Sequence, residues 1–303
     1  AREPMVRQPC SMAFDARGRL CVGMGPQYRN PKPATPGDSV VLVLDTDGDG
    51  NPDYIDADSD GDNDLYIVRG SYQHDARSPM YQDVLCENDG KGNFQDMTIK
   101  SGLGVETRFI GWGAGMVDLD NDGHPDLFYV TGNVYPEVEQ KLRQYAYKTP
   151  RIVFRNLGNG TFEEFPLDAA PQSSRGCAFG DFDNDGDVDV LIWNMDAPPT
   201  LLRNDLPASP ARHWIKVKLE GVTSNRSAIG GRVTVSYNGK RQAQEVLSQS
   251  SYYSVNDWRL HFGLGAACEA DVTVRWPDAT LTTQTFKAQS RYRYALVTRG
   301  RPT

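Results

Sequence analysis

Short runs of apolar residues, bounded by glycine and aspartate, recur through the first two thirds of the chain. Residues 40–44, 65–68 and 127–130 are apolar or aromatic at every position. Runs of this length between turn residues predict strands. Only residues 136–147 have a helical composition, with proline and glutamate early and charged side chains throughout. We therefore expect a β protein with one helix on an insertion loop.

The pattern changes after residue 210, where apolar and polar residues begin to alternate. Residues 215–220 and 232–237 both alternate, and the second run ends in the hairpin dipeptide Asn238-Gly239. Residues 272–276 repeat the alternation. Alternation of period two is typical of antiparallel strands with one buried face. It predicts a separate antiparallel β-sandwich-like domain over residues 209–303, with residues 208–211 as the linker.

An internal repeat organises the region before that linker. GAGMVDLDNDGHPDLFYVTG (113–132) resembles CAFGDFDNDGDVDVLIWN (177–194), and a third copy ends in DADSDGDNDLYIVRG (56–70). A second element repeats in phase, as LCENDGKGNFQDMT from Leu85, VFRNLGNGTFEEF from Val153 and a degenerate LLRNDLP from Leu201. Each unit therefore predicts four strands with an aspartate-rich loop between the first two, which is the plan of a propeller blade.

These elements predict an all-β fold, a partial or small β-propeller of three to four blades followed by the sandwich-like domain. We divide the chain into an N-terminal blade segment (1–44), calcium-binding blades (45–208) and the C-terminal domain (209–303). No run of about 18 apolar residues is present, so the sequence predicts no membrane span.

The aspartate-rich loops have the spacing of a calcium site. Ca²⁺ prefers about six to eight oxygen ligands, and aspartates at loop positions 1, 3, 5 and 9, with glycine at position 6, turn carboxylates inward around a tight bend. This pattern occurs four times and predicts three to four bound Ca²⁺ ions. His124 stands where a backbone carbonyl is expected to coordinate, with its ring in solvent. The predicted ligands are Asp45, Asp47, Asp49 and Asp53; Asp56, Asp58, Asp60 and Asp64; Asp118, Asp120, Asp122, His124 and Asp126; and Asp181, Asp183, Asp185, Asp187 and Asp189.

Two alternatives concern the loops themselves. Position 12 is apolar or aromatic in three of them (Ile67, Tyr129 and Ile192), which excludes EF-hands because an EF-hand needs an acidic residue there. The first loop has Asp56 at that position, but a strand-like run precedes it. The first two loops lie so close together that they could share Asp56, or form one continuous calcium-binding ribbon.

Charge is distributed very unevenly along the chain. The net charge is −8, and no basic residue lies between Lys32 and Arg69. Such an acidic stretch repels itself in a compact state unless cations offset it; a solvated acidic linker is the alternative. The acidity argues against a nucleic-acid partner, which would need a basic face.

The remaining reactive residues form no catalytic motif. The five cysteines are too widely spaced for a zinc or haem site; Cys10 and Cys21 flank a predicted hairpin and could pair, or could remain thiols like the others. None of the four histidines falls in a metal-binding pair, and no nucleophile-elbow or phosphate-loop motif is present. We therefore expect a protein that is not an enzyme.

Several segments resemble known families. Residues 117–132 and 180–194 resemble FG-GAP/VCBS repeats, the calcium-binding blades also found in integrin α-chains, and residues 45–64 resemble thrombospondin type 3 repeats. HWIKVKLEG, SNRSAIGGRVTV, SSYYSVNDWRLHFGLG and VTVRWPDA, within residues 213–298, resemble an ASPIC/UnbV domain. Residues 113–298 are thus similar to the cartilage acidic protein family. The first 44 residues are instead similar to a blade of bacterial dehydrogenase-like propellers, without the C-x-x-C-H haem motif.

The resemblance implies a secreted, non-enzymatic structural or adhesion protein in which Ca²⁺ pins the blade loops. It also implies a signal peptide outside this numbering, and an extracellular protein or glycan as partner. Propellers of that family have about six or seven blades, more than this chain provides, so a self-assembling oligomer or filament whose blades complete each other is an alternative. A polysaccharide-binding or polysaccharide-active protein is another, with Tyr252, Tyr253 and Trp258 as the aromatic patch. Asn159 and Asn225 lie in glycosylation sequons.

Overall fold

The fold is taken from a computed structural model of the whole chain. It describes residues 9–14, 20–24, 64–68, 83–89, 93–105, 109–141, 143 and 145–298. The predicted loop at 45–53 and most of the loop at 56–64 lie outside these residues, so the predictions for Asp45 through Asp60 rest on sequence alone.

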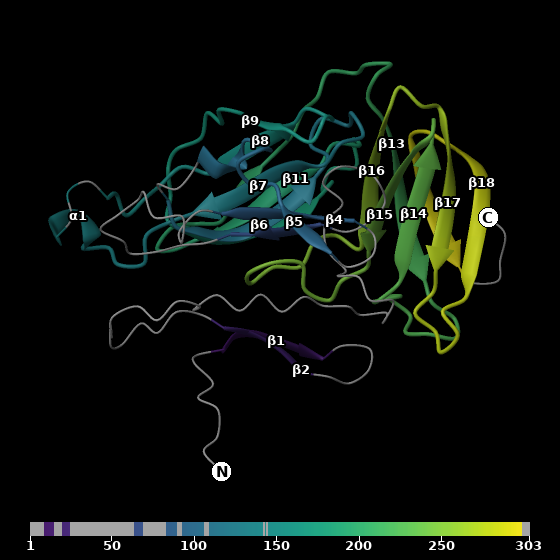
Figure 1. Cartoon of the computed structure of the whole chain (residues 1–303), viewed down its shortest axis with the longest axis horizontal. Helices are drawn as coiled ribbons and strands as arrows, with labels where there is room; N and C mark the ends of the chain where they lie inside the picture. Colours follow the sequence, from purple (N-terminus) through teal and green to yellow (C-terminus); the bar gives the residue numbers. More distant parts are fainter. Residues whose placement is uncertain are drawn as a thin grey trace, which may run out of the picture.

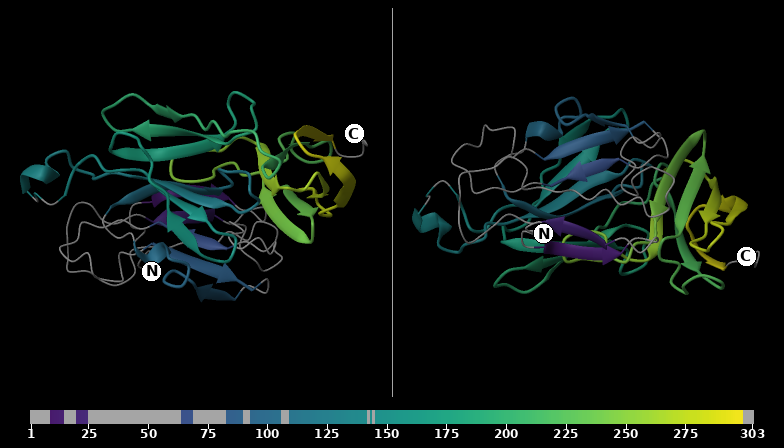
Figure 2. Two further views of the ribbon diagram at one scale, coloured as in Figure 1. Left: turned by 90° about the horizontal axis from the view of Figure 1, so that it is seen from above. Right: turned by 60° about the horizontal axis from the view of Figure 1, so that its bottom comes forward.

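Three antiparallel sheets form blade-like units that lie side by side (Figures 1 and 2). Blade A is β3 (Leu65–Ile67), β4 (Val84–Asn88) and β5 (Phe94–Asp96). Blade B is β6 (Gly111–Val117), β7 (Asp126–Thr131), β8 (Ile152–Asn156) and β9 (Phe162–Glu164). Blade C is β10 (Ser174–Gly180), β11 (Asp189–Asn194) and β12 (Thr200–Leu202). The predicted propeller-like, all-β architecture is confirmed.

Blade B is buried on both faces, which explains its continuous apolar strand. On β7, Leu127 and Tyr129 pack into a core shared with blade A, whereas Phe128 and Val130 pack into a core shared with blade C. Because successive side chains of a strand point to opposite faces, a strand between two sheets needs apolar residues at every position.

Helical structure is limited to short segments in the described residues. A single 3₁₀ turn, η2 (Leu103–Val105), follows blade A, and α1 (Val138–Lys141) has only four residues. The predicted helix over residues 136–147 is therefore much shorter than expected. Its one turn is held by the buried side chain of Val138, and the described residues after Lys141, which are 143 and 145–147, are not helical.

Strands β1 (Pro9–Phe14) and β2 (Leu20–Met24) pair with each other in an antiparallel sheet, which confirms the hairpin predicted around Cys10 and Cys21. Its register pairs Cys21 with Ala13, so Cys10 does not lie opposite Cys21.

The C-terminal domain consists of two sheets that share one core. The first contains β16 (Arg259–Gly265), β13 (His213–Glu220) and β19 (Arg293–Thr298) in that order. The second contains β15 (Lys240–Glu245), β14 (Arg232–Tyr237), β17 (Glu269–Arg275) and β18 (Thr283–Ser290). Alternate residues of both sheets meet in the core around Trp276 and Phe262. This is the predicted sandwich, and β13 with β19 forms a parallel pair among otherwise antiparallel ones.

The sandwich stands at one end of the blades, on the side where the aspartate-rich loops lie (Figure 1). Side chains of β13 and β16 contact the loops of blades B and C directly. The two domains therefore meet at the residues for which the sequence predicts metal binding.

Candidate metal centres

Two of the predicted loops bring three carboxylates together. In blade B, Asp118, Asp120 and Asp126 each offer an oxygen within 4.8 Å of the others; in blade C, Asp181, Asp183 and Asp189 do the same. Asp118, Asp126, Asp181 and Asp189 are buried. The three aspartates of each cluster stand at loop positions 1, 3 and 9. The spacing in the sequence therefore identified two acidic clusters that could hold a metal ion.

The bend of each loop depends on two residues with positive φ. Position 4 is Asn121 in one loop and Asn184 in the other, at φ 59° and 64°, and position 6 is Gly123 and Gly186, at φ 91° and 102°. Glycine and asparagine tolerate this conformation far better than other residues. The amide N–H of each glycine then donates to the position 1 aspartate, at 2.8 Å to Asp118 and 2.9 Å to Asp181.

The aspartate at position 9 binds an asparagine at the end of the next strand of its blade, or just after it. Asp64 accepts a hydrogen bond from the backbone N–H of Asn88 at 2.8 Å. Asp126 accepts from Asn156 at 2.8 Å, and Asp189 accepts from the equivalent Asn204 at 2.9 Å. The same contact thus recurs in all three blades. Through this hydrogen bond the position 9 carboxylate joins its loop to a neighbouring strand, whether or not it also binds a metal ion.

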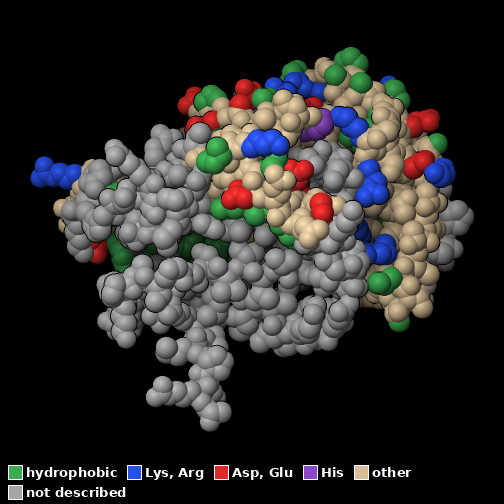
Figure 3. Space-filling model, in the orientation of Figure 1, with side chains coloured by type: hydrophobic (Ala, Val, Ile, Leu, Met, Phe, Trp, Pro, Cys, Tyr) green, Lys and Arg blue, Asp and Glu red, His purple; other side chains and the backbone are tan. Residues whose placement is uncertain are grey.

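An arginine precedes the asparagine in blades B and C. Arg155 lies 2.8 Å from Asp120, and Arg203 lies 2.9 Å from Asp183. Both arginines are about half exposed, so each offsets part of the loop's negative charge from the solvent side. Figure 3 shows basic and acidic side chains interspersed on the surface near the boundary between the blades and the sandwich.

Burial and mutual repulsion disfavour negative charge in the blade B cluster. Burial, followed by the charges of Asp122 and Asp126, raises the pKa of Asp118 well above its usual value. Burial raises the pKa of Asp126 to about 7, and burial with the charge of Asp120 raises the pKa of Asp122 to about 6. A cation among these carboxylates would oppose these shifts, because a nearby opposite charge favours the ionised form.

In the blade C cluster, one buried oxygen has no partner. Asp181 Oδ2 accepts from Gly186 N–H and contacts the ammonium of Lys216, whereas Asp181 Oδ1 is buried and accepts no hydrogen bond. An unsatisfied buried carboxylate oxygen is costly, and a divalent cation held by the three aspartates would satisfy it. The donor set, all carboxylate oxygen, suits a hard cation such as Ca²⁺. The residues present therefore fit a calcium ion.

Other predicted ligands lie beside the clusters and not in them. Asp122 and Asp185 each accept from the backbone N–H two residues later. Both oxygens of Asp187 are engaged, with Asn121 Nδ2 at 3.0 Å and the backbone N–H of Leu206 at 2.8 Å. Asp187 thus links the two loops and holds the segment that leads to the linker.

The prediction that the His124 ring faces solvent is wrong. The ring is half-buried beside Gly158, with Nε2 2.8 Å from Lys240 Nζ of the sandwich. The position faces the second domain, which sequence analysis had not placed there. Burial, with the charge of Lys240, lowers the pKa of His124.

Sequence analysis did not single out the asparagines and arginines that support the clusters. The signal was nonetheless present, because Arg155-Asn156 and Arg203-Asn204 occupy the same place in the second repeated element. The sequence did not indicate that the arginine and asparagine of this second element contact the aspartates of the loop.

Comparison with known families agrees with this architecture. A model of the FG-GAP-like repeat matches residues 56–129 and 146–192, which cover the predicted loop at 56–64 and the loops of blades B and C. A model named ASPIC and UnbV matches residues 221–300, and a domain of unknown function, DUF7133, matches residues 1–61. No curated protein matches the chain. The chain therefore has FG-GAP-like repeats followed by an ASPIC/UnbV domain, an arrangement that suggests an extracellular, adhesion-like protein. None of its described helices is long and apolar enough to cross a membrane.

Proposed function

We propose that this chain is a secreted, non-enzymatic adhesion or structural protein in which Ca²⁺ bound by the blade loops fixes the ends of the blades. The observation that carries the proposal is the pair of equivalent three-carboxylate clusters, one of which contains the buried, unpartnered Asp181 Oδ1. The acidic stretch at residues 45–64 extends the same chemistry, so we expect three to four ions in all.

An ion in either cluster would connect three strands of its blade. Position 1 follows the first strand, position 9 begins the second, and the position 9 carboxylate also holds the third strand through Asn156 or Asn204. A ligand that binds only the folded state at 100 times its dissociation constant stabilises that state by about 2.7 kcal/mol. Calcium would therefore act as a structural pin.

The way these carboxylates are used supports a role other than catalysis. Those at positions 1 and 9 accept backbone hydrogen bonds within their own loop, as Asp118 does from Gly123 and Asp189 does from Phe182. A carboxylate committed to a loop and a cation has little proton affinity left for acid–base work.

Thermal unfolding in the presence and absence of calcium tests the proposal. We expect millimolar Ca²⁺ to raise the melting temperature by about 5 to 10 °C relative to calcium-free buffer, given about 2–4 °C per kcal/mol for a chain of this size. Asp183→Asn removes a ligand from the blade C cluster and should reduce the rise. The matched control is Asp168→Asn, because Asp168 is exposed and lies outside both clusters. A melting temperature that calcium does not change would contradict the proposal.

A second candidate function, self-association, rests on a different observation. The outer face of blade C exposes Leu191, Trp193 and Leu201, with 52%, 60% and 45% of their surface accessible. Leu191 pairs with Leu201, as Phe128 pairs with Val153 in blade B, where those residues are buried between blades. The face thus has the composition of a blade–blade contact, and we infer that a second copy of this chain packs against it.

A further inference from the structure

Strand β16 of the sandwich presents one face to its own core and the other to the two loops. Leu260, Phe262 and Leu264 are buried in the sandwich core. The alternate residues, Arg259, His261, Gly263 and Gly265, all contact or closely approach the loops of blades B and C. Because strand side chains alternate, this division places a whole strand face against the candidate metal centres.

The two glycines allow the strand to approach the blade B loop closely. A Cβ atom at Gly263 would overlap Asp118 Oδ2, and one at Gly265 would lie 2.9 Å from the carbonyl oxygen of Asp122. The backbone N–H of Gly265 donates to the Asn121 carbonyl at 3.1 Å. Any larger side chain at these positions would push the strand off the loop.

The other two residues bind the same position in each loop. His261 Nε2 lies 2.7 Å from Asn121 Oδ1, at position 4 of the blade B loop. Arg259 donates to Asn184 Oδ1, at position 4 of the blade C loop, and to the carbonyl of Asp181 at 2.8 Å. One strand therefore contacts the left-handed asparagine of two loops from neighbouring blades.

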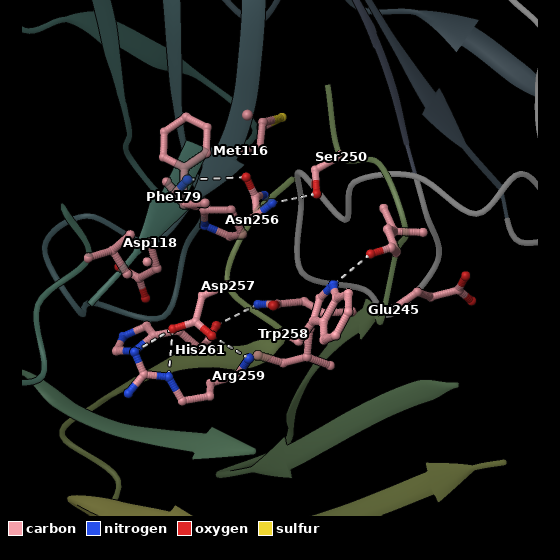
Figure 4. A pocket seen from close by; sticks show the side chains of 18 of the residues that line it. Met116, Asp118, Phe179, Glu245, Ser250, Asn256, Asp257, Trp258, Arg259 and His261 are labelled. Atoms are coloured by element: carbon pink, nitrogen blue, oxygen red, sulfur yellow. Dashed lines mark hydrogen bonds and ion pairs between the residues drawn. The ribbon is translucent and has the colours of Figure 1, made fainter. Parts of the chain in front are cut away.

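Further contacts from the second sheet hold the blade B bend. Gln242 Nε2 donates to the Gly123 carbonyl at 3.2 Å, and the Tyr237 hydroxyl donates to the same carbonyl at 3.4 Å. A cavity of about 180 Å³ lies beside these contacts, and Asp118, Arg259 and His261 are among its lining residues (Figure 4). The metal centres are thus set in the interface between the domains.

We propose that Arg259, His261, Gly263 and Gly265 are positioning residues for the two metal centres, so that docking of the C-terminal domain sets the calcium affinity of the blade loops. The proposal rests on the proposed calcium binding. A loop must hold its position 4 asparagine and position 6 glycine at positive φ to direct its carboxylates inward. Strand β16 binds the position 4 asparagine of both loops through His261 and Arg259, and its Gly263 lies against Asp118 of the blade B loop. Linkage makes the effect reciprocal, so bound calcium also favours docking.

Calcium titration calorimetry on the full chain tests the proposal through His261. His261→Leu removes the donor to Asn121 and should weaken binding at the blade B loop about 5- to 10-fold, at the low end of couplings between sites. His261→Gln keeps a donor on a side chain of similar reach, so it should restore most of the affinity. The matched control is Lys218→Gln, because Lys218 is exposed on the neighbouring strand and pairs with Arg259 in register.

The outcomes separate this proposal from the proposed function. If the contacts only join the domains, His261→Leu lowers the melting temperature equally with and without calcium and leaves every calcium dissociation constant unchanged, and the proposal is overturned. Equal affinities for His261→Leu and His261→Gln, both below the wild type, would also overturn it, because the donor would then not matter. A wild-type chain that binds no calcium would instead refute the proposed function.

Discussion

Asp118 and Asp181 occupy position 1 of equivalent loops, yet their surroundings differ in charge. Burial, followed by the charges of Asp122 and Asp126, raises the pKa of Asp118, which faces the backbone of Gly263. Asp181 contacts the ammonium of Lys216, whose side chain is only 4% exposed. One ligand is therefore repelled by its neighbours, whereas the other belongs to a buried ion pair between the domains.

This difference predicts opposite effects of the same substitution in calcium-free buffer. Asp118→Asn removes a disfavoured charge and should raise the melting temperature. Asp181→Asn leaves the Lys216 ammonium buried without its partner and should destabilise the fold by about 3–5 kcal/mol. In millimolar calcium both variants should melt below the wild type, because each has lost a ligand. Thermal unfolding of the three proteins in both buffers is the measurement, and the same direction for both variants without calcium would contradict it.

The raised pKa values also predict an inverted pH dependence. Asp122 and Asp126 titrate at about 6 and about 7 in the folded chain, against about 3.9 for an unfolded aspartate. Between these limits the folded state binds more protons at these two residues. Without calcium, their contribution to stability is therefore greatest at low pH and is lost as the pH rises through 6 to 7. Bound calcium keeps the carboxylates ionised, so protons then compete with the ion.

Melting temperatures at pH 5.5 and 7.5 measure this effect. In buffer freed of calcium by dialysis, the chain should be more stable at pH 5.5; with millimolar calcium, that advantage should disappear or reverse. Asp168→Asn should follow the wild type in both series, because Asp168 is exposed and outside the clusters. A pH trend that calcium leaves unaltered would show that these carboxylates do not meet the ion.

At the scale of single elements, local sequence patterns predicted the strands and the acidic clusters. The apolar run at residues 127–130 predicted a strand, and β7 packs into two cores as such a run requires. The aspartate spacing predicted both clusters because positions 1, 3 and 9 are set by one loop's own backbone. Fold class, domain order and the two described centres could thus be predicted from patterns that lie within about twenty residues.

The contacts that sequence analysis missed join elements distant in the chain. Asn121 meets His261 across 140 residues, and Asp181 meets Lys216 across the linker. The segment that contains Trp258–Gly265 is identified from the sequence only by its resemblance to an ASPIC/UnbV domain. That its polar face lies on the aspartate-rich loops depends on how the two domains dock, and no local spacing encodes this.

At the scale of the whole molecule, both faces of blade B and the loop ends of blades B and C are covered by neighbouring sheets. Blade B is covered by blades A and C, and the loop ends of blades B and C are covered by the sandwich. The outer face of blade C departs from this rule, since Leu191, Trp193 and Leu201 remain exposed. A contiguous exposed apolar face is typical of an interaction site.

Sedimentation velocity over a range of concentrations tests whether a second copy covers that face. In a symmetric dimer each substitution acts twice, so Trp193→Ser, which removes the largest side chain of the face, should weaken dimerisation by roughly a thousandfold, given about 2 kcal/mol for a central aromatic residue in each copy. Ile99→Ser is the matched control, because Ile99 is an apolar residue even more exposed than Trp193 and lies on the segment after blade A, outside the face. If the wild type sediments as a monomer at every concentration in calcium, or if both variants weaken the dimer equally, the face of blade C does not bind a second copy. A dimer lost only with Trp193→Ser would mean that the packing between blades inside one chain continues between chains.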